Sequence, residues 1–363
     1  MITQKIRVAQ QYVNSSNGGG LKTEYLALKS RKELSDEYEF IPVVLNNCHC
    51  GISLRDIIFY KKEFQKVRPD IIHIRGAGVE SLNAVIGARL AGQGKVLVAV
   101  HGMFSDLGYY NQIKRWVCRN VIEHMIFKMA DGISCVCESA EKRDNFNEFR
   151  EKVLPCIYNR IPIYRTCNEV EKKETRIKLE LPENAVIGIF TGRVTKEKGL
   201  EYLLTAIKNM DNNWPIGLCM LIVGDGEYLD KMRAECMKLK NSGKIIFTGL
   251  QKNVYEYLCA SDFFFLPSLH ENLSISILEA CAAKLPCVVT GVGGNTEIIK
   301  DGENGIVIPA RSADAIEDGI KKLYDKDLRI KLIENVKRMD YSKFSDENVD
   351  MQLKRVYEIL LSK

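Results

Sequence analysis

Short apolar runs alternate with longer amphipathic stretches along the whole of this 363-residue chain. Apolar runs of this kind, bounded by glycine, proline or polar residues, indicate buried strands, and the amphipathic stretches indicate helices. In the first half the predicted strands are 6–13, 40–45, 70–74, 96–100 and 132–136, and the predicted helices include 54–67, 82–91 and 112–129. Strands that alternate with helices predict a parallel, doubly wound α/β sheet.

The second half repeats this pattern after a charged stretch, 164–175, that we interpret as a linker. Its predicted strands are 185–191, 217–223, 245–248, 263–267, 287–290 and 305–307. The chain is too long for one core, so we expect an N-terminal domain over 1–163 and a C-terminal domain over 164–345. The last segment, 346–363, contains an amphipathic helix that we expect to pack back on the N-terminal domain. Two such domains would face each other across a cleft, and ligands of open α/β sheets bind beyond the carboxyl ends of the strands.

The composition is that of a soluble globular protein, with 46% hydrophobic and 27% charged residues. No apolar run approaches the ~18 residues of a membrane span. The first residues contain no long apolar stretch, so we expect no secretory signal. The 12 cysteines are scattered, which is typical of cytosolic proteins that use cysteine as a small hydrophobic residue. Cys48-His49-Cys50 and Cys135-Val136-Cys137 are either metal-ligand fragments or residues packed on one face of a strand, and we favour packing.

The positive charge is concentrated in the first half of the chain. Residues 1–163 contain 23 basic and 17 acidic residues, whereas the remainder contains 29 and 30. This balance suggests an acidic partner, with an anionic membrane surface ahead of nucleic acid, for which there is no motif. The predicted helix within 111–129 has basic and aromatic residues and a single acid, Glu123. It is either a helix that lies on an anionic membrane or a packed helix with a solvated basic face. The residues in question are Lys114, Arg115, Arg119, Lys128, Trp116 and Phe127.

Two acids in the second half, Glu271 and Glu279, are separated by seven residues. Glu271 precedes an apolar run that opens at Ser274, a residue type favoured at helix N-caps, and Glu279 lies on the predicted helix. One carboxylate therefore lies beside the positive end of a helix while the other points from its first turns to the same side. Two acids placed in this way can bind several hydroxyl groups of one polar ligand.

Two cations, Arg193 and Lys198, flank a tight turn that follows the first strand of the second half. Such a pair can neutralise a diphosphate, since arginine offers a planar fork and lysine a point charge. A solvated basic loop before a helix is the alternative for this segment taken alone. The turn Gly224-Asp225-Gly226 has Leu229 where a dinucleotide fingerprint requires a third glycine, which argues against an NAD-dependent oxidoreductase.

The first half offers a glycine loop and a histidine. Gly18, Gly19 and Gly20 follow the first strand, where their amides can approach an anion, although a flexible turn is the alternative. His101 ends the strand 96–100 and is either a structural histidine or a residue that binds a sugar hydroxyl or moves a proton. His73 lies in mid-strand and is expected in the core, and His270, beside Glu271, is ambiguous.

In this order and over nearly the whole chain, these motifs resemble the retaining glycosyltransferases of family 4 (glycosyl transferases group 1), which have the GT-B fold. The resemblance also includes Gly293-Gly294 with Glu297, and Gly302 with Gly305. It implies that Arg193 and Lys198 bind the donor diphosphate and that Glu279 binds the ribose. It further implies that Glu271 and the backbone of Asn272, Leu273 and Ser274 position the donor sugar, with Gly249–Gln251 near the base. Asn272 is a departure, because many relatives have glycine after the first glutamate. A side chain at this position can change which sugar fits, so the resemblance does not identify the donor sugar.

The resemblance implies transfer of a sugar from a nucleotide diphosphate, with UDP as the default and GDP open, and with retention at the anomeric carbon. Arg193, Lys198 and a helix N-terminus would replace a divalent metal, so neither a metal nor another cofactor is expected. Glycine residues 18–20 would approach the donor phosphates and the acceptor, and His101 would bind a sugar hydroxyl or move a proton. The acceptor is a saccharide that we expect to be lipid-linked. We expect a cytoplasmic enzyme, peripheral at the inner face of the plasma membrane, in synthesis of capsule, O-antigen or another envelope polysaccharide. A catalytically silent glycan-binding or scaffold protein on the same fold is the alternative.

Overall fold

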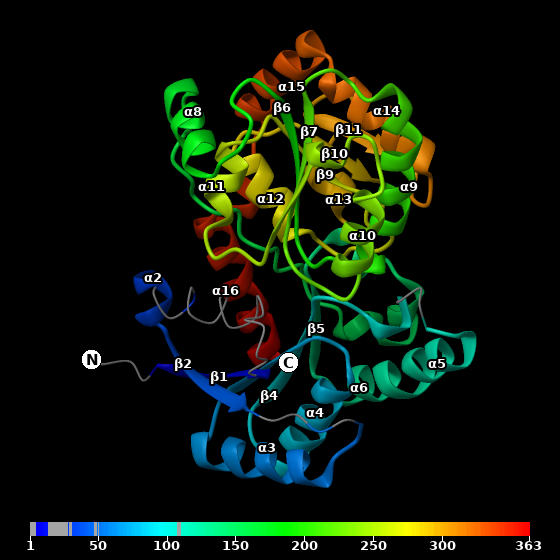
Figure 1. Cartoon of the computed structure of the whole chain (residues 1–363). Coiled ribbons are helices and arrows are strands. Elements are labelled where there is room, and N and C mark those ends of the chain that lie inside the picture. The colour runs from blue at the N-terminus through cyan, green and yellow to red at the C-terminus, as the bar shows by residue number, and fades with distance from the viewer. Residues whose placement is uncertain (1–4, 14–27, 29–30, 47–48, 50, 107–109) are drawn as a thin grey trace. The chain divides into compact units, whose positions relative to one another are not determined.

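The computed structural model describes the chain except for residues 1–4, 14–27, 29–30, 47–48, 50 and 107–109. It divides into two compact units, Met1–Tyr158 with Asp346–Lys363, and Asn159–Ser345. Each unit is built around one parallel sheet (Figure 1). The division falls after Tyr158, five residues before the boundary placed from the sequence, and the last helix belongs to the first unit.

The first unit has a five-stranded parallel sheet in the order β2-β1-β3-β4-β5. Its central strands β3 and β4 are almost entirely buried, as expected for a parallel sheet covered on both faces. The strands are β1 (Ile6–Val13), β2 (Tyr38–Leu45), β3 (Ile71–Arg75), β4 (Lys95–Val100) and β5 (Gly132–Cys135).

Helices cover both faces of this sheet. Along one face α3 packs on α4, and α4 packs on α6, whereas α16 contacts β4 from the other face (Figure 1). The α-helices are α2 (Lys32–Ser35), α3 (Leu54–Val67), α4 (Val79–Ala91), α5 (Gln112–Val117), α6 (His124–Met129), α7 (Glu138–Glu141) and α16 (Asp346–Ser362). The described part of this unit also contains two 3-10 segments, η1 (Phe104–Asp106) and η3 (Asp144–Lys152), and a π-helical turn, η2 (Cys118–Glu123).

Polar contacts fasten α16 to the first unit. Arg31 binds Asp346 at 3.0 Å and Asp350 at 2.8 Å. The fully buried ring of Tyr357 places its hydroxyl 2.8 Å from Nδ1 of His73 on β3. His73 is therefore a core residue, as predicted.

The second unit has a six-stranded parallel sheet in the order β11-β10-β9-β6-β7-β8. Its strands are β6 (Val186–Thr191), β7 (Leu218–Val223), β8 (Ile245–Gly249), β9 (Phe263–Leu266), β10 (Cys287–Thr290) and β11 (Gly305–Ile308). The order reverses at β6 and β9, so right-handed crossovers place α9 and α10 on one face and α11 and α12 on the other. The major helices are α8 (Glu169–Lys178), α9 (Leu200–Met210), α10 (Leu229–Cys236), α11 (Val254–Cys259), α12 (Ile275–Ala282), α13 (Asn295–Ile298), α14 (Ala313–Tyr324) and α15 (Lys326–Arg338).

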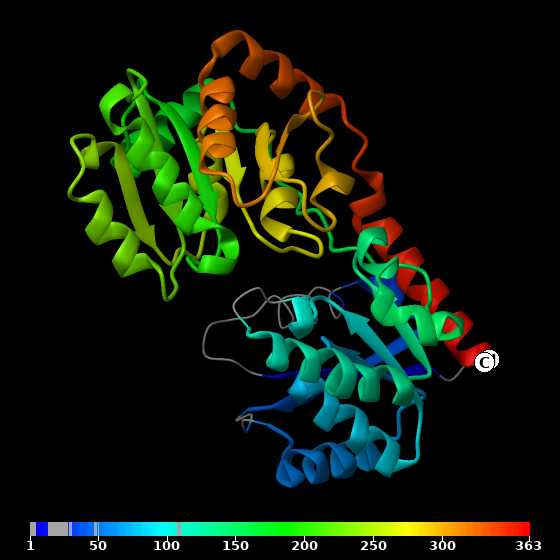
Figure 2. The same ribbon diagram turned by 90° about the vertical axis from the view of Figure 1, so that its right-hand side faces the viewer.

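Two sequence expectations need correction. The stretch interpreted as a linker, 164–175, contains the start of α8, because Asn168 and Glu171 form a reciprocal capping box that begins a helix. The predicted helix 112–129 is one continuous helical run, but its middle is the π-helical turn η2 (Figure 2). Such a turn inserts an extra residue that amphipathic periodicity does not reveal.

Candidate active site

A buried ion pair lies just before the N-terminus of α12. Glu271 is 9% exposed, and its Oε1 accepts hydrogen bonds from Lys198 Nζ at 2.5 Å and from Ser268 Oγ at 2.7 Å. The pair keeps both charges compensated in a desolvated position, which is the condition for burying them. An ammonium group has three N–H donors, so Lys198 retains capacity for an anionic ligand.

Two close backbone approaches bring the loops around this pair together. Gly199 has φ +71°, and a Cβ there would lie 1.8 Å from the carbonyl oxygen of Pro267. Gly293 has φ +54°, and a Cβ there would lie 1.9 Å from the carbonyl oxygen of Glu271. Only glycine fits at these two positions, which explains why the basic turn and the Gly293-Gly294 motif accompany the Glu271 loop.

The backbone after Glu271 is fixed through its carbonyl groups. Gly294 N donates to Asn272 O at 2.6 Å, and Asn159 Nδ2 donates to Leu273 O at 2.9 Å. Ser274 occupies the N-cap position of α12 as predicted, although its side chain makes no capping hydrogen bond. The segment Asn272–Ser274 is buried and ends at the positive end of the helix dipole, where an anionic or strongly polar ligand group is stabilised.

Arg193 stands apart from the buried pair. Its side chain is 71% exposed and lies 3.5 Å from Glu197, so it can move toward a ligand without loss of packing. Two hydroxyl oxygens of the same loop, Thr191 Oγ1 and Thr195 Oγ1, are buried with no hydrogen-bond partner within the described residues. The structure therefore brings Lys198 and Glu271 into contact but leaves Arg193 at the surface.

Glu279 is a desolvated carboxylate on α12. Burial raises its pKa from 4.5 to about 7. Among the residues that the structure describes, no side chain forms a hydrogen bond or ion pair with it. Tyr164 lies close enough that, after its own burial, the Glu279 charge raises the Tyr164 pKa. A partly buried acceptor of this kind can bind ligand hydroxyl groups.

The turn Gly224–Gly226 supports the basic loop. Gly192 N donates to Val223 O at 3.0 Å, and Val194 N donates to Asp225 O at 2.9 Å. The turn acts as scaffold for the loop that carries Arg193.

The other predicted segments differ in how far the structure describes them. In Gly249–Gln251, Gln251 Nε2 donates to Thr248 O at 2.8 Å and the side chain of Leu250 is exposed. In the first unit His101 follows β4 directly and is partly buried. The pKa of His73 is lowered by burial and, to a smaller extent, by the nearby Arg75 and His101. The glycine loop 18–20 lies outside the described residues.

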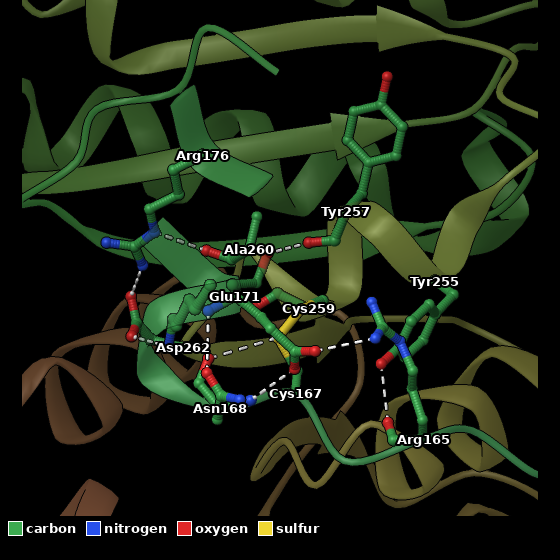
Figure 3. The surroundings of a disulfide bond; sticks show 12 residues. Arg165, Cys167, Asn168, Glu171, Arg176, Tyr255, Tyr257, Cys259, Ala260 and Asp262 are labelled. Carbon is green, nitrogen blue, oxygen red and sulfur yellow. Dashed lines mark hydrogen bonds and ion pairs between the residues drawn. A yellow bond between two sulfur atoms is a disulfide. The ribbon is translucent and has the colours of Figure 1, made fainter. Parts of the chain in front are cut away.

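Cysteine has more than one role in this chain. Cys167 and Cys259 form a disulfide between the segment before α8 and the end of α11 (Figure 3). Tyr255 Oη donates to Arg165 O at 2.7 Å beside it, and Tyr164 and Tyr255 have ring centroids 4.6 Å apart. The expectation that cysteine serves here as a small hydrophobic residue is wrong for this pair, which is 92 residues apart in sequence, and holds for buried cysteines such as Cys219.

The run 112–129 is exposed at its start and buried near its end. No residue of α5 is buried, and Ile113 and Trp116 are 76% and 60% exposed beside the exposed side chains of Lys114 and Arg115. Phe127, by contrast, is in the core. No helix in the described part of the chain is long and apolar enough to span a bilayer.

Sequence reasoning missed several supporting residues. Ser268 and Asn159 hold the Glu271 loop, and Tyr164 lies beside Glu279. Long-range folding brings Asn159 and Tyr164 to the site, whereas Ser268 lies only three residues before Glu271 and its local spacing could have marked it. The sequence did mark Glu123, because it is the single acid of a basic helix, and in the structure this residue is completely buried.

Comparisons with known proteins identify the class of the protein. A family model described as glycosyl transferases group 1 matches residues 171–339. The UDP-Gal:alpha-D-GlcNAc-diphosphoundecaprenol alpha-1,3-galactosyltransferase of Escherichia coli is 26% identical over 333 residues, 86% of this chain and 83% of that protein. The lipopolysaccharide core biosynthesis glycosyltransferase LpsE of Rhizobium meliloti is 31% identical over 175 residues, 48% of this chain and 50% of LpsE.

Among solved structures, HepE from Anabaena in complex with UDP and glucose superimposes with a TM-score of 0.77. The match covers 99% of this chain and 100% of HepE at 18% identity, a likeness that concerns the fold. The predicted fold class and enzyme class are both confirmed. The chain has the GT-B fold with a glycosyl transferases group 1 domain at residues 171–339, and the protein is a glycosyltransferase.

Proposed function

We propose that this enzyme transfers a sugar from a nucleotide diphosphate sugar to a saccharide acceptor with retention at the anomeric carbon. The observation that carries the proposal is the buried Lys198–Glu271 pair at the N-terminus of α12. It combines a cation, a carboxylate and helix-terminal amides within one fixed loop. These are the groups that a sugar diphosphate requires.

Each donor group has a proposed partner. Lys198 and Arg193 neutralise the diphosphate and stabilise the leaving nucleotide, Glu271 with the Asn272–Ser274 backbone positions the sugar, and Glu279 accepts from the ribose hydroxyls. Most of the rate enhancement then comes from charge stabilisation at the departing phosphate. Because the arginine, the lysine and the helix N-terminus supply the positive charge, we propose that the reaction needs no divalent metal.

Retention is proposed to follow from delivery of the acceptor on the face of the leaving group. Glu271 Oε1 already accepts two hydrogen bonds, from Lys198 and Ser268, which suits a positioning carboxylate better than an attacking nucleophile. His101 in the first unit is proposed to bind an acceptor hydroxyl or to move its proton.

The relatives suggest the donor and acceptor classes. The Escherichia coli relative is named for a UDP-linked donor and a diphosphoundecaprenol-linked acceptor, and LpsE for lipopolysaccharide core biosynthesis. We propose a UDP-linked donor and a lipid-linked saccharide acceptor in capsule, O-antigen or other envelope polysaccharide synthesis, at the cytoplasmic face of the membrane. Exposed Ile113 and Trp116 beside Lys114, Arg115 and Arg119 support contact with anionic lipid.

A transfer assay tests the proposal. The enzyme would be incubated in EDTA with each of UDP-Glc, UDP-Gal, UDP-GlcNAc, UDP-GalNAc, UDP-GlcA and GDP-Man, and with a synthetic α-GlcNAc-diphosphate on a short lipid chain. The anomeric configuration of the first-formed product would be read by NMR from the one-bond coupling between C1 and H1. An α-linked product in EDTA is the expected result. A β-linked product would contradict retention, and strict dependence on added metal would contradict the charge argument.

A further inference from the structure

A short turn in the first unit, η1, is held by hydrogen bonds in which the amide, the hydroxyl and the carbonyl group of Ser105 all take part. Ser105, in η1, donates from N to Glu123 Oε1 at 2.9 Å and from Oγ to Glu123 Oε2 at 2.8 Å. Its carbonyl oxygen accepts from Arg115 Nε at 2.9 Å. This turn begins three residues after His101, at the carboxyl end of β4.

The carboxylate that holds this turn is costly to bury. Glu123 is fully buried in the π-helical turn η2, and it also accepts from Asn145 Nδ2 at 2.9 Å. Burial raises its pKa, while the hydrogen bonds from Ser105 oppose that change. A buried carboxylate with neutral hydrogen-bond donors is a weak source of stability. Its fixed geometry, together with a π-turn, a feature frequent at functional sites, indicates a positioning role.

What the turn presents is an aromatic ring. Phe104 is 37% exposed, although Met103 and Ser105 on either side of it are buried. The ring packs on the backbone of Gly78, the N-cap of α4, where a Cβ would lie 2.4 Å from Phe104 Cε2. Tyr110 flanks it, with the ring centroids 6.5 Å apart and the planes inclined by 29°. The ring is therefore fixed on its backbone side and open on another.

The place of the ring in the fold suggests its ligand. Strands β3 and β4 run parallel with Arg75 beside Ala99, so Gly78 and Phe104 follow the carboxyl ends of neighbouring strands. Ligands of open α/β sheets bind at this edge. The face of an aromatic ring carries partial negative charge. It therefore attracts the polarised C–H groups on the apolar face of a pyranose.

We propose that Phe104 contacts the sugar ring of the acceptor, and that Glu123 is a positioning residue that acts through Ser105 to fix Phe104 in place. This inference rests on the proposed function, in which the acceptor is a saccharide. It assigns a contact and a support in the acceptor-binding unit that neither the motifs nor the comparisons identify.

The central test is a double-substitution cycle on Phe104 and Gly78, read with the synthetic α-GlcNAc-diphosphate lipid as acceptor. Phe104→Ala and Phe104→Leu should each raise the acceptor KM about tenfold, and Phe104→Trp should restore it, since Leu keeps apolar area but lacks a ring face. The donor KM should change by less than about twofold, as expected for a group that touches only the acceptor. Gly78→Ala should displace the ring and raise the acceptor KM in the wild-type background, with no further effect in Phe104→Ala.

Glu123→Gln tests the positioning role. Gln replaces one carboxylate oxygen with an NH2 group, which would face the donor Asn145 Nδ2 in one orientation of the amide and the backbone N–H of Ser105 in the other. The acceptor KM should rise as for Phe104→Ala, with no added effect in the Phe104→Ala background, whereas Glu148→Gln, an exposed acid of η3, should behave as wild type. A loss of thermal stability with unchanged acceptor KM would show that Glu123 has a structural role only.

Several results would overturn the proposal. These are an acceptor KM within about twofold of wild type for Phe104→Ala, full activity of Phe104→Leu, or an equal Gly78→Ala effect with and without the ring. If wild-type enzyme transfers no sugar, the proposed function fails, and saturation-transfer NMR with methyl glycosides then tests the ring by itself. Binding by wild type but not by Phe104→Ala would support the site, and no binding by wild type would reject it.

Discussion

Glu279 provides a prediction in which stability and function move in opposite directions. Its pKa is raised from 4.5 to about 7 by burial. A carboxylate whose pKa is raised by folding holds a proton in the folded state that the unfolded chain has already released. The free energy of unfolding therefore falls as the pH rises from about 4.5 to about 7, and the full cost remains at higher pH.

The size of this cost follows from the same values. A change from 4.5 to about 7 corresponds to about 3 kcal/mol of lost stability at pH 8. Glu279→Gln keeps the shape of the side chain and removes the charge. We expect the variant to be about 1–3 kcal/mol more stable than wild type at pH 8 and equal to it near pH 4.5. In a unit of this size, that gain corresponds to a rise of about 2–10 °C in Tm.

The assay is thermal unfolding of wild type and variant at pH 4.5, 6 and 8, with nucleotide-sugar affinity measured at pH 8. Because Gln offers a weaker acceptor for ribose hydroxyls, donor affinity should fall by about 10–100-fold. Glu256→Gln, which breaks only an exposed pair with Lys178, should change Tm little at any pH. A Glu279→Gln variant that is less stable at pH 8, or whose effect does not depend on pH, would refute the reasoning.

Three further predictions concern the second unit. Lys198→Met and Glu271→Gln should each destabilise it and abolish most transfer, while the double variant should cost about 1–3 kcal/mol less than the sum; additive costs in urea unfolding would show that the pair does not interact. Burial raises the pKa of Asp262, but the charges of Lys172 and Arg176 outweigh burial and lower the pKa below 3.8. The carboxylate therefore contributes to the free energy of unfolding above pH 3.8, and this contribution is lost on acidification. Asp262→Asn leaves the buried Arg176 without its carboxylate partner and should cost about 3–5 kcal/mol at pH 7, and a Tm equal to wild type there would contradict this. Cys167→Ser should lower stability by about 3–5 kcal/mol under oxidising conditions and remove any effect of dithiothreitol on Tm, since the disulfide closes 92 residues of chain. A Cys167→Ser protein that dithiothreitol still destabilises would indicate a different redox group.

Much of the proposed donor site was predictable because its residues lie in one local segment at a strand end. Glu271, Ser274 and Glu279 occupy a loop, an N-cap and a helix that their own sequence specifies. Lys198 was predictable as a cation in a glycine turn, but its contact with Glu271 was not, because Gly199 and Gly293 bring loops together that are far apart in sequence.

Less of the first unit could be predicted from the sequence. Its strand pattern predicts the sheet, yet the turn held by Glu123 depends on a π-helical insertion and on Asn145 from a later segment. Apolar periodicity reports which face of a helix is buried, and it carries no information about a single buried acid. The capping box of α8 could have been read from Asn168 and Glu171, whose spacing is the usual one.

The central claim is that Lys198 and Glu271 bind a nucleotide diphosphate sugar without metal. Isothermal titration of UDP-sugars and GDP-mannose in EDTA, with wild type and Lys198→Met in parallel, tests it most directly. Binding of one nucleotide sugar to wild type, weakened at least about 30-fold in Lys198→Met, is the predicted result, equivalent to about 2 kcal/mol for a lost charged contact. Equal affinity in both proteins, or binding by wild type only when a divalent metal is added, would contradict the account.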